Sequence, residues 1–477
     1  MNMKKCEGKK VNGENSDSVN IVKKRRFRLK SQQLIPLSFL VAIMIGTALL
    51  KLPVATVKGE STSLLTALFT AVTSLCVTGL VVVDTYAHWT LFGKIVILIM
   101  IQIGGLGIIA VTSALMLMFR KKVSIGQQLM ILDSFNLNTL SGVMHFLVKV
   151  FTGTLLVEGM GAILYMFVFI PQFGTLRGIW YSCFTSVSAF CNAGIDIIGP
   201  NSLIEYNHNY PVMITTMLLI VLGGLGYVVW FDINSGIDRG MKCRYPVRTV
   251  FKRLGEHTKL VINLTLVLIV FGSICVFIME YHNPLTIGNM SIGDKVLNSL
   301  FQSVTFRTAG FAAVPQQALK DETCMVGLFL MFIGGSPIGT AGGVKTVTMF
   351  VVLLNAVAFI RSRNESVVFG KKIPLDLIRK ATAIVTVSFV TSFILMILLM
   401  MTGNVNLVDA SYEIFSATAT VGLSRNLTST LNESGKIIVI IGMYLGRIGP
   451  ISMGMFFSSG KEQKNKIRFA QGQYFVG

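Results

Sequence analysis

Four short tracts that end in a glycine and an apolar residue interrupt the hydrophobic text of this chain at nearly equal spacing. The tracts are CVTGL (76–80), CNAGI (191–195), RTAGF (307–311) and TATVGL (418–423). Their glycines are 115, 116 and 112 residues apart, and such regular spacing of one pattern indicates internal repeats. Backbone that bends within hydrocarbon survives only where protein or water satisfies its polar groups. Four such bends therefore predict one shared, hydrated lining at the centre of the molecule.

The composition predicts that these tracts lie within a membrane. Of the 477 residues, 52% are hydrophobic and only 13% are charged, and the mean hydropathy is +0.68. Soluble domains carry about 25% charged residues, so we expect a multi-pass membrane protein surrounded by lipid. The seven cysteines have no CxxC or His-paired spacing, which favours packing roles over disulfides or metal ligands.

The net charge of +20 is distributed in a way that favours a membrane topology over nucleic-acid binding. Ten of the 42 Lys and Arg residues lie in 1–31, seven in 235–260 and six in 361–380, with smaller groups at 119–147 (Arg120, Lys121 and Lys122) and 457–477. If all five segments face the cytoplasm, the positive-inside rule is satisfied throughout. The first 30 residues lack the apolar core and cleavage site of a signal peptide, so they are predicted to form a cytosolic arm. Both termini are expected in the cytoplasm, and no nucleic-acid partner is expected.

Between the basic segments the same order of elements recurs four times. A stretch of about 20 apolar residues can cross a bilayer, and first spans are expected near 33–51, 147–170, 259–280 and 380–402. Each is followed by a helix too short to cross, over Leu64–Leu75, Ile179–Phe190, Ile292–Phe306 and Asp409–Ala419. The tract comes next, and second spans are expected near 90–118, 210–234, 323–360 and 434–457.

These elements predict an all-α polytopic fold with eight spanning helices in four tandem helix–pore-loop–helix units around a pseudo-fourfold central pore. The units, called repeats 1 to 4 below, cover 33–118, 119–234, 235–360 and 361–457, between the arm at 1–32 and a cytosolic tail at 458–477. The second spans also carry glycines, for which helix packing is the favoured role because small residues let helices approach closely. These glycines are Gly104, Gly105, Gly223, Gly224, Gly334, Gly335 and Gly446.

The tracts have the chemistry of a site for a small cation. A short helix that stops in mid-membrane directs the negative end of its dipole at the centre, and a glycine with positive φ lets successive carbonyls face one way. Carbonyl oxygens arranged in this way replace the hydration shell of a cation, and the tracts contain no Asp or Glu. The candidate filter residues are Cys76, Val77, Thr78, Gly79, Cys191, Asn192, Ala193, Gly194, Thr308, Ala309, Gly310, Thr420, Val421 and Gly422.

A second glycine-rich segment, GGSPIGTAGG, occupies 334–343 within the expected second span of repeat 3. Glycine costs about 1 kcal/mol and proline about 3 kcal/mol in a helix interior, so a regular helix cannot run through it. One interpretation is a kinked helix whose freed groups bond to neighbours; the other is an unwound loop that blocks or opens the path beneath the filter. The residues concerned are Gly334, Gly335, Ser336, Pro337, Gly339, Thr340, Gly342 and Gly343.

Three basic residues are further candidates for a role at the tracts or at the 334–343 segment. Arg447 lies in otherwise apolar text, where a charge is costly enough to be a functional candidate. Facing the pore, it would oppose a passing cation and pair with carbonyls of the 334–343 segment; the alternative is an arginine that snorkels to an interface. Lys345 is a weaker candidate of the same kind. Arg307, the first residue of the third tract, either braces filter carbonyls or lies at the outer mouth.

These motifs resemble those of the Trk/Ktr/HKT superfamily of potassium transporters. SLCVTGLVVVDT, SAFCNAGI, TFRTAGF and SATATVGLS look like its four selectivity loops, and FIGGSPIGTAGGVKT (332–346) and YLGRIGP (444–450) resemble further signatures. The resemblance extends from about residue 35 to the C-terminus. Eight spans after a basic arm are most similar to the Ktr-type membrane subunit.

The resemblance implies potassium uptake through a K⁺-selective pore in the bacterial plasma membrane, with K⁺ at the filter tracts and 334–343 as an intramembrane gating loop. Glycine in all four tracts favours potassium, because serine in the first tract accompanies sodium preference in the plant-like branch. A homodimer and a cytosolic ring of Rossmann-type regulatory subunits that sense ATP and ADP are also implied. This chain itself has no GxGxxG or P-loop motif. Whether sodium takes part, by symport or by modulation, stays open, and no covalently bound cofactor is expected.

Other functions fit the sequence less well. A less selective Na⁺/K⁺ channel-like transporter is the alternative within the same class. A secondary transporter of another solute would show two related halves and polar or charged residues at the midplane. An enzyme would need a nucleophile, a metal cluster or an acid–base pair, but the five histidines are dispersed and form no HExxH pattern. The chain is therefore not expected to be an enzyme.

Overall fold

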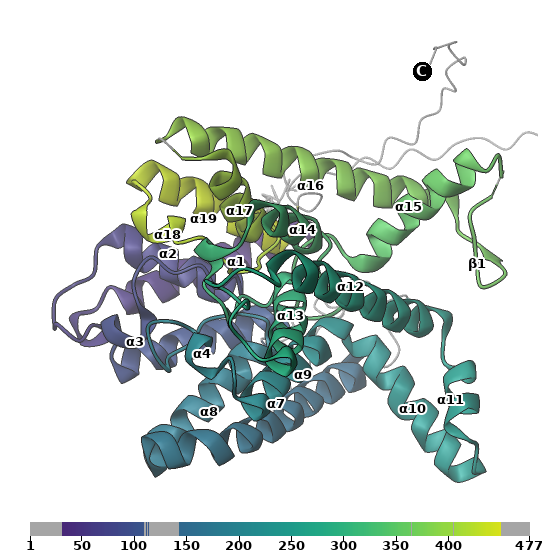
Figure 1. Cartoon of the computed structure of the whole chain (residues 1–477), viewed down its shortest axis with the longest axis horizontal. Helices are drawn as coiled ribbons and strands as arrows, with labels where there is room; N and C mark the ends of the chain where they lie inside the picture. Colours follow the sequence, from purple (N-terminus) through teal and green to yellow (C-terminus); the bar gives the residue numbers. More distant parts are fainter. Residues whose placement is uncertain are drawn as a thin grey trace, which may run out of the picture.

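The computed structural model describes residues 31–108, 111, 113, 143–363, 365–403 and 405–449, and it is mainly helical there (Figure 1). Residues 1–30 of the predicted arm, the segment with Arg120, Lys121 and Lys122, and the tail at 458–477 lie outside these ranges. Within them, the strands form one small hairpin, in which β1 (Val367–Val368) pairs with β2 (Lys371–Lys372). The all-α prediction is confirmed.

Each repeat opens with a long apolar helix and a short one. The first helices are α1 (Ser31–Leu50), α7 (Val143–Phe173), α12 (Glu256–Glu280) and α16 (Leu375–Met401). The short helices are α2 (Leu64–Leu75), α8 (Thr175–Phe190), α13 (Ile292–Phe306) and α17 (Leu407–Thr418). α2 and α13 have the predicted bounds. α8 begins earlier than expected because Gly174, with φ 81°, turns the chain directly out of α7.

The spans that follow the tracts are broken in repeats 2 and 3. In repeat 2 this corrects the expectation of one continuous span over 210–234, whereas in repeat 3 the break falls in the segment where the sequence predicted an interruption. The second helices of all four repeats end before the expected spans do. They are α4 (Leu91–Leu106), α9 (Tyr210–Leu225), α14 (Asp321–Phe332) and α19 (Glu433–Ile448). Three of them end at a glycine with positive φ, a conformation that terminates a helix: Gly107 (89°), Gly226 (89°) and Gly449 (87°). After Gly226 the chain resumes as α10 (Tyr227–Cys243), bent by 99° from α9. After a loop over 333–345 it resumes as α15 (Thr346–Ile360).

By length and hydropathy, three described helices can cross a membrane alone, namely α7, α12 and α16, and the bent pair α9–α10 is a fourth if it counts as one span. Large apolar side chains along the three long helices are exposed. Examples are Phe167 (74% exposed), Ile278 (68%) and Met401 (78%). Such residues are expected where lipid replaces water as the surrounding solvent.

Polar residues in the connections determine where several helices begin. Each accepts a hydrogen bond from a backbone N–H in the first turn, a group that the helix itself leaves unpaired. These caps are Ser63, Thr90, Asn209, Ser291 and Asn432. The connections also contain η1 (Pro53–Ala55), α3 (Thr85–His88), η2 (Ile204–Tyr206), η3 (Gln316–Ala318) and α18 (Leu427–Thr430).

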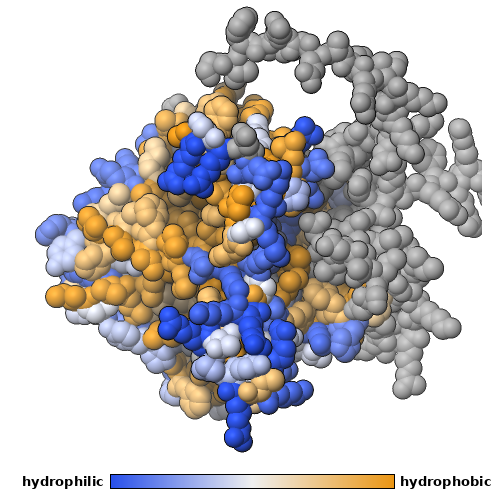
Figure 2. Space-filling view, turned by 90° about the vertical axis from the view of Figure 1, so that its right-hand side faces the viewer, coloured by the Kyte–Doolittle hydropathy of each residue, from blue (hydrophilic) through white to orange (hydrophobic). Residues whose placement is uncertain are grey.

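Two of the basic segments lie at the same end of the molecule. In Figure 1, α10, α11 (Val247–Arg253) and the β1–β2 hairpin project at the right-hand end, whereas α3 and α18 lie toward the left. Lys371 of the hairpin forms an ion pair with Glu256 at the start of α12, with 2.8 Å between nitrogen and oxygen. Figure 2 looks onto this end and shows hydrophilic residues gathered beside hydrophobic flanks.

Candidate functional site

The four tracts share one backbone conformation. The residue two positions before each glycine has a left-handed φ, at Val77 (55°), Asn192 (60°), Thr308 (68°) and Thr420 (50°). The glycine has a positive φ as well, at Gly79 (97°), Gly194 (65°), Gly310 (82°) and Gly422 (99°). This alternation is suited to turning successive carbonyls to one side. The predicted filter residues are all buried, except that Gly422 is partly exposed.

The tracts close into a ring through contacts between neighbours. A Cβ added to each tract glycine would come within 3.0 Å of the carbonyl oxygen that precedes the glycine of the next tract. The pairs are Gly79 with Ala193, Gly194 with Ala309, Gly310 with Val421, and Gly422 with Thr78. Repeats 1, 2, 3 and 4 therefore meet in cyclic order, and the last contacts the first. A side chain at any of these four positions would displace neighbouring backbone.

Glycines of the second helices let the short helices pack beside the ring. A Cβ added to three of them would collide with a carbonyl oxygen at the end of a short helix. The pairs are Gly104 with Leu75, Gly223 with Phe190, and Gly446 with Thr418. Helix packing is thus the observed role of these three glycines. Gly334 differs, because its closest neighbour is the carbonyl of Gly342 within the loop.

Buried hydroxyl groups brace each tract, and the sequence analysis missed them. In repeats 1 and 4 a hydroxyl accepts the N–H of the tract glycine, at 3.0 Å in both cases: Thr73 for Gly79 and Ser416 for Gly422. In repeats 2 and 3 a hydroxyl donates to the carbonyl of the residue after the tract glycine, from Ser188 to Ile195 (2.5 Å) and from Thr305 to Phe311 (2.6 Å). The available signal is a Ser or Thr five or six residues before every tract glycine.

The segment 334–343 is an unwound loop, so the kinked-helix interpretation is wrong. Its backbone groups are satisfied by the broken second helix of repeat 2. Ser336 N–H donates to Gly224 O (2.9 Å), Thr340 N–H donates to Gly223 O (3.1 Å), and Tyr227 N–H donates to Ile338 O (3.0 Å). The break at Gly226 frees these groups, and the loop takes the place of the missing helical turn. Two further loop residues lie at this contact. A Cβ added to Gly226 would collide with the carbonyl oxygen of Pro337, and a Cβ added to Gly339 would lie 2.8 Å from Gly223 O.

The same loop contacts the bases of two tracts. The Thr340 hydroxyl donates to the carbonyl of Phe190, the last residue of α8 (3.0 Å). On the other side, a Cβ at Gly342 would collide with the Thr420 hydroxyl and with Ala419 O. The loop therefore lies against repeats 2 and 4 directly beside their tracts. Within it, Gly343 has φ 67° and Gly335 is packed against Ala341 and Gly224.

Arg447 joins three repeats through backbone carbonyls. Its Nη1 donates to Thr340 O in the loop (2.7 Å), and its Nη2 donates to Gly104 O and to Gly105 O (3.4 Å) at the end of α4. No carboxylate lies within ion-pair distance of Arg447 among the described residues. The predicted pairing with loop carbonyls is present, and the guanidinium of the partly exposed Arg447 is bound to carbonyls of repeats 1 and 3.

The other two basic side chains, those of Lys345 and Arg307, also contact the loop. Lys345 donates from Nζ to Ala341 O (2.6 Å), four residues earlier in the chain. Arg307 is buried, with 7% of its surface exposed, and its Nη2 donates to Gly334 O (3.3 Å). Arg307 thus extends from the third tract to the first residue of the loop, and it does not lie at an outer mouth.

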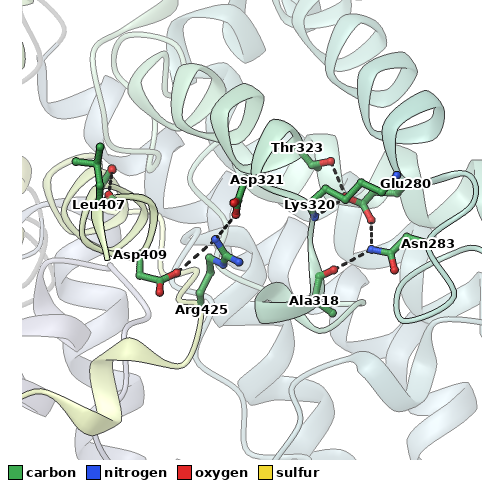
Figure 3. A network of polar contacts seen from close by, with 10 residues as sticks. Glu280, Asn283, Ala318, Lys320, Asp321, Thr323, Leu407, Asp409 and Arg425 are labelled. Carbon is green, nitrogen blue, oxygen red and sulfur yellow. Dashed lines mark hydrogen bonds and ion pairs between the residues drawn. The ribbon is translucent and has the colours of Figure 1, made fainter. Parts of the chain in front are cut away.

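A network of charges follows the fourth tract (Figure 3). Arg425 forms ion pairs with Asp321 at the start of α14 (3.0 Å) and with Asp409 at the start of α17 (3.3 Å). Glu280, at the end of α12, is fully buried and accepts from Asn283 Nδ2 (2.7 Å), from the Thr323 hydroxyl (2.5 Å) and from a nearby backbone N–H. The two ion pairs neutralise Arg425, and the pair with Asp321 connects repeats 3 and 4.

Comparison with known proteins finds a family of cation transporters. The family model TrkH, described as a cation transport protein, matches residues 22–468. The Ktr system potassium uptake protein B of Bacillus subtilis is 36% identical over 94% of this chain and 97% of its own length. The potassium/sodium uptake protein NtpJ of Enterococcus hirae is 34% identical over 90% of this chain and 94% of its own length. The Ktr system potassium uptake protein D of Bacillus subtilis is 31% identical, with 94% and 98% covered.

A solved structure has the same fold. The potassium transporter TrkH from Vibrio parahaemolyticus superposes with a TM-score of 0.69 over 92% of this chain and 87% of that one, at 16% sequence identity. This likeness supports an all-α polytopic membrane fold. From the family match and the relatives together, the chain belongs to the TrkH family of cation transport proteins, which makes it a multi-pass transporter and not an enzyme.

Proposed function

We propose that this chain is the pore-forming membrane subunit of a potassium-uptake system, with the ring of four tracts as its selectivity filter. The closed ring carries the proposal, because four like carbonyl positions around one point can replace the hydration shell of a monovalent cation. Each short helix ends at the ring, so its negative dipole end stabilises the ion without a carboxylate. The relatives named as potassium uptake proteins support K⁺ as the transported ion.

The proposed architecture has four helix–pore-loop–helix units and eight spans, with the boundaries 33–118, 119–234, 235–360 and 361–457. The recurring order of long helix, short helix, tract and second helix supports it. In this scheme α9–α10 and α14–α15 are broken spans whose interruptions face the pore and not lipid. The filter consists of the fourteen tract residues named from the sequence.

The loop over 334–343 is proposed as the gate, with Arg447 as an inner barrier. Its position against the tracts of repeats 2 and 4 supports this role, since a change in the loop must change what lies directly below the filter. The Arg447 guanidinium adds an uncompensated positive charge at this depth, which repels a passing cation. Lys345, with its nitrogen on the loop carbonyl of Ala341, adds to the same barrier.

A bacterial plasma-membrane location with both termini in the cytoplasm is proposed from the charges. Two basic segments, 235–260 and 361–380, lie at one end and are joined by the Lys371–Glu256 ion pair. The positive-inside rule then assigns that end to the cytoplasm. The same end is the proposed docking surface for a cytosolic ring of Rossmann-type subunits that sense ATP or ADP, and two membrane subunits are proposed to form a homodimer. Relatives that carry the name of a Ktr system support a multi-subunit assembly.

A less selective Na⁺/K⁺ transporter is the second candidate, because one relative is named a potassium/sodium uptake protein. In it, sodium would be a second permeant ion or a coupling ion. The two functions differ in the ratio of K⁺ to Na⁺ flux at equal driving force.

Two experiments test the proposed function. Expression in a bacterium that lacks potassium uptake should restore growth on low-potassium medium, whereas failure despite surface expression contradicts it. In proteoliposomes we expect K⁺ and Rb⁺ flux to exceed Na⁺ flux; equal fluxes would favour the second candidate.

The hydroxyl brace of the fourth tract gives a prediction about selectivity. Ser416→Ala removes the hydroxyl that accepts the N–H of Gly422, and the loss of one such hydrogen bond costs about 0.5–1.5 kcal/mol. The tract should relax to satisfy that group, and the K⁺ to Na⁺ flux ratio should fall by about fivefold. Ser429→Ala is the matched control, because Ser429 is exposed and its hydroxyl bonds only to a local carbonyl. Equal flux ratios in the two variants would refute the brace.

A further inference from the structure

A small cavity with three polar side chains in its lining lies behind the second and third tracts. It has about 20 Å³ available to the centre of a water molecule. Its polar lining comes from Asn192 of the second tract, Arg307 of the third tract, and Thr265 of α12. Gly224 of α9 and Gly335 of the loop complete one wall, and apolar side chains form the rest.

Two of the lining side chains have a buried polar atom without a partner among the described residues. These atoms are Nε of Arg307 and Oγ1 of Thr265, in side chains that are only 7% and 5% exposed. A buried polar atom left unsatisfied costs about 1–3 kcal/mol, and this cost is highest for a charged group. Two such atoms around one cavity therefore point to a ligand.

Asn192 supplies an acceptor at the same place. With its amide nitrogen turned toward the carbonyls of Ile220 and Ala189, it donates to both, at 3.3 and 3.2 Å. That orientation leaves the amide oxygen on the side of Gly224, which lines the cavity. The lining thus offers a charged donor, an amide acceptor and a hydroxyl that can act as either.

We propose that this cavity binds a single water molecule that hydrogen-bonds to Arg307, Thr265 and Asn192. Water fits because it accepts from the guanidinium and donates to the amide oxygen at once. The space exceeds the roughly 10–15 Å³ that one water requires, and three polar partners match the usual number. A chloride ion fits less well, because it is larger and the Asn192 oxygen would repel it.

The water connects the filter to the loop. Arg307, one of the partners of the water, also donates to the carbonyl of Gly334, the first residue of the loop. Gly335, the second residue of the loop, lines the cavity itself. The water in turn reaches Asn192, whose left-handed backbone is part of the second tract. Movement of the loop would therefore break or reshape the support behind two tracts. This functional consequence rests on the proposed filter and gate, whereas the water site itself does not.

The corresponding place in repeat 2 is filled by a side chain. Glu158 of α7 is buried there and accepts from Gln102 Nε2 (3.1 Å). Its carbonyl accepts from Ser186 (2.6 Å), just as Ile269 O accepts from Ser303 (2.8 Å) in repeat 3. Repeat 3 therefore has the apolar Ile269 where repeat 2 has a glutamate, and Ile269 lines the cavity.

The direct test is a map of the purified full-length protein at a resolution that shows ordered water, by cryo-electron microscopy or crystallography. We expect one density peak at roughly 2.7–3.2 Å from Arg307 Nε and Thr265 Oγ1. Thr265→Val, which replaces the hydroxyl by a methyl group, should remove the peak, and Thr265→Ser should keep it. Well-resolved side chains around a site without density would overturn the proposal in the native protein, even if a variant fails to fold. An anomalous peak at the site after soaking in bromide would also overturn it.

The flux ratio tests the consequence separately. Thr265→Val should lower the K⁺ to Na⁺ flux ratio by about fivefold, the factor for one ordinary hydrogen bond, and Thr265→Ser should leave it within about twofold. An unchanged ratio in a Thr265→Val protein that has lost the water refutes the link to the filter. A native protein without cation flux refutes the proposed function, while the map still decides the water site.

Discussion

Gly310→Ser is expected to lower the K⁺ to Na⁺ flux ratio by about tenfold or more. Gly310 has φ 82°, and a Cβ there would lie 2.6 Å from Val421 O, 3.0 Å from Gly194 Cα and 3.3 Å from Gly422 Cα. A left-handed conformation costs a residue with a Cβ about 1–2 kcal/mol, and about 1.4 kcal/mol is a factor of ten. The collisions add to this cost, so the ring must open at one side. The measurement is the flux of each ion into proteoliposomes.

A second glycine separates backbone strain from close approach. Gly59 has φ 69°, but nothing lies within 4 Å of the position of its Cβ. Gly59→Ser therefore introduces strain without a collision and should leave the flux ratio within about twofold. A Gly310→Ser protein as selective as the native one would show that the third tract does not select the ion.

Arg447→Ala is expected to raise cation flux through the resting protein on the order of tenfold. The change removes a charge from beneath the ring and also the hydrogen bonds from the guanidinium to Thr340 O and to the carbonyls of Gly104 and Gly105. A hydrogen bond to a charged group stabilises by about 1.5–3 kcal/mol. Without these bonds the loop is no longer held to repeat 1, so both the tether and the electrostatic barrier are lost. Unchanged flux in reconstituted vesicles would exclude the barrier.

Arg447→Lys distinguishes the two contributions. Lysine keeps the charge, but a single ammonium group cannot span the loop carbonyl and the α4 carbonyls as the guanidinium fork does. If the charge forms the barrier, the flux of this variant should stay near the native value. If the tether is decisive, its flux should approach that of Arg447→Ala.

The sequence predicted the short helices and tracts well because their signals are local. The bounds of α2 and α13 agree with the prediction, and all four tract glycines have a positive φ. They depended on the nearly equal spacing of the tract glycines and on the interruption of the apolar sequence at each tract. The family resemblance rested on the same tracts, and the family match confirms it.

The break in the second span of repeat 2 and the partners of Arg307 and Glu158 were not predictable in this way. Hydropathy marks 210–234 as one apolar stretch and does not reveal that Gly226, among several glycines, takes the positive φ. The choice depends on the loop of repeat 3, which fills the gap from more than 100 residues away. The contact of Arg307 with Gly334 and the burial of Glu158 likewise arise only when neighbouring repeats meet.

The closed ring is made by one polypeptide, and this has a consequence for how such proteins diverge after gene duplication. In a channel of four identical subunits, one mutation alters all four quadrants at once. Here it alters a single quadrant, so the repeats can specialise independently, as Cys76, Cys191, Arg307 and Ala419 illustrate at the position three residues before each tract glycine. In the proposed filter, a substitution can therefore change the ion preference through one repeat at a time.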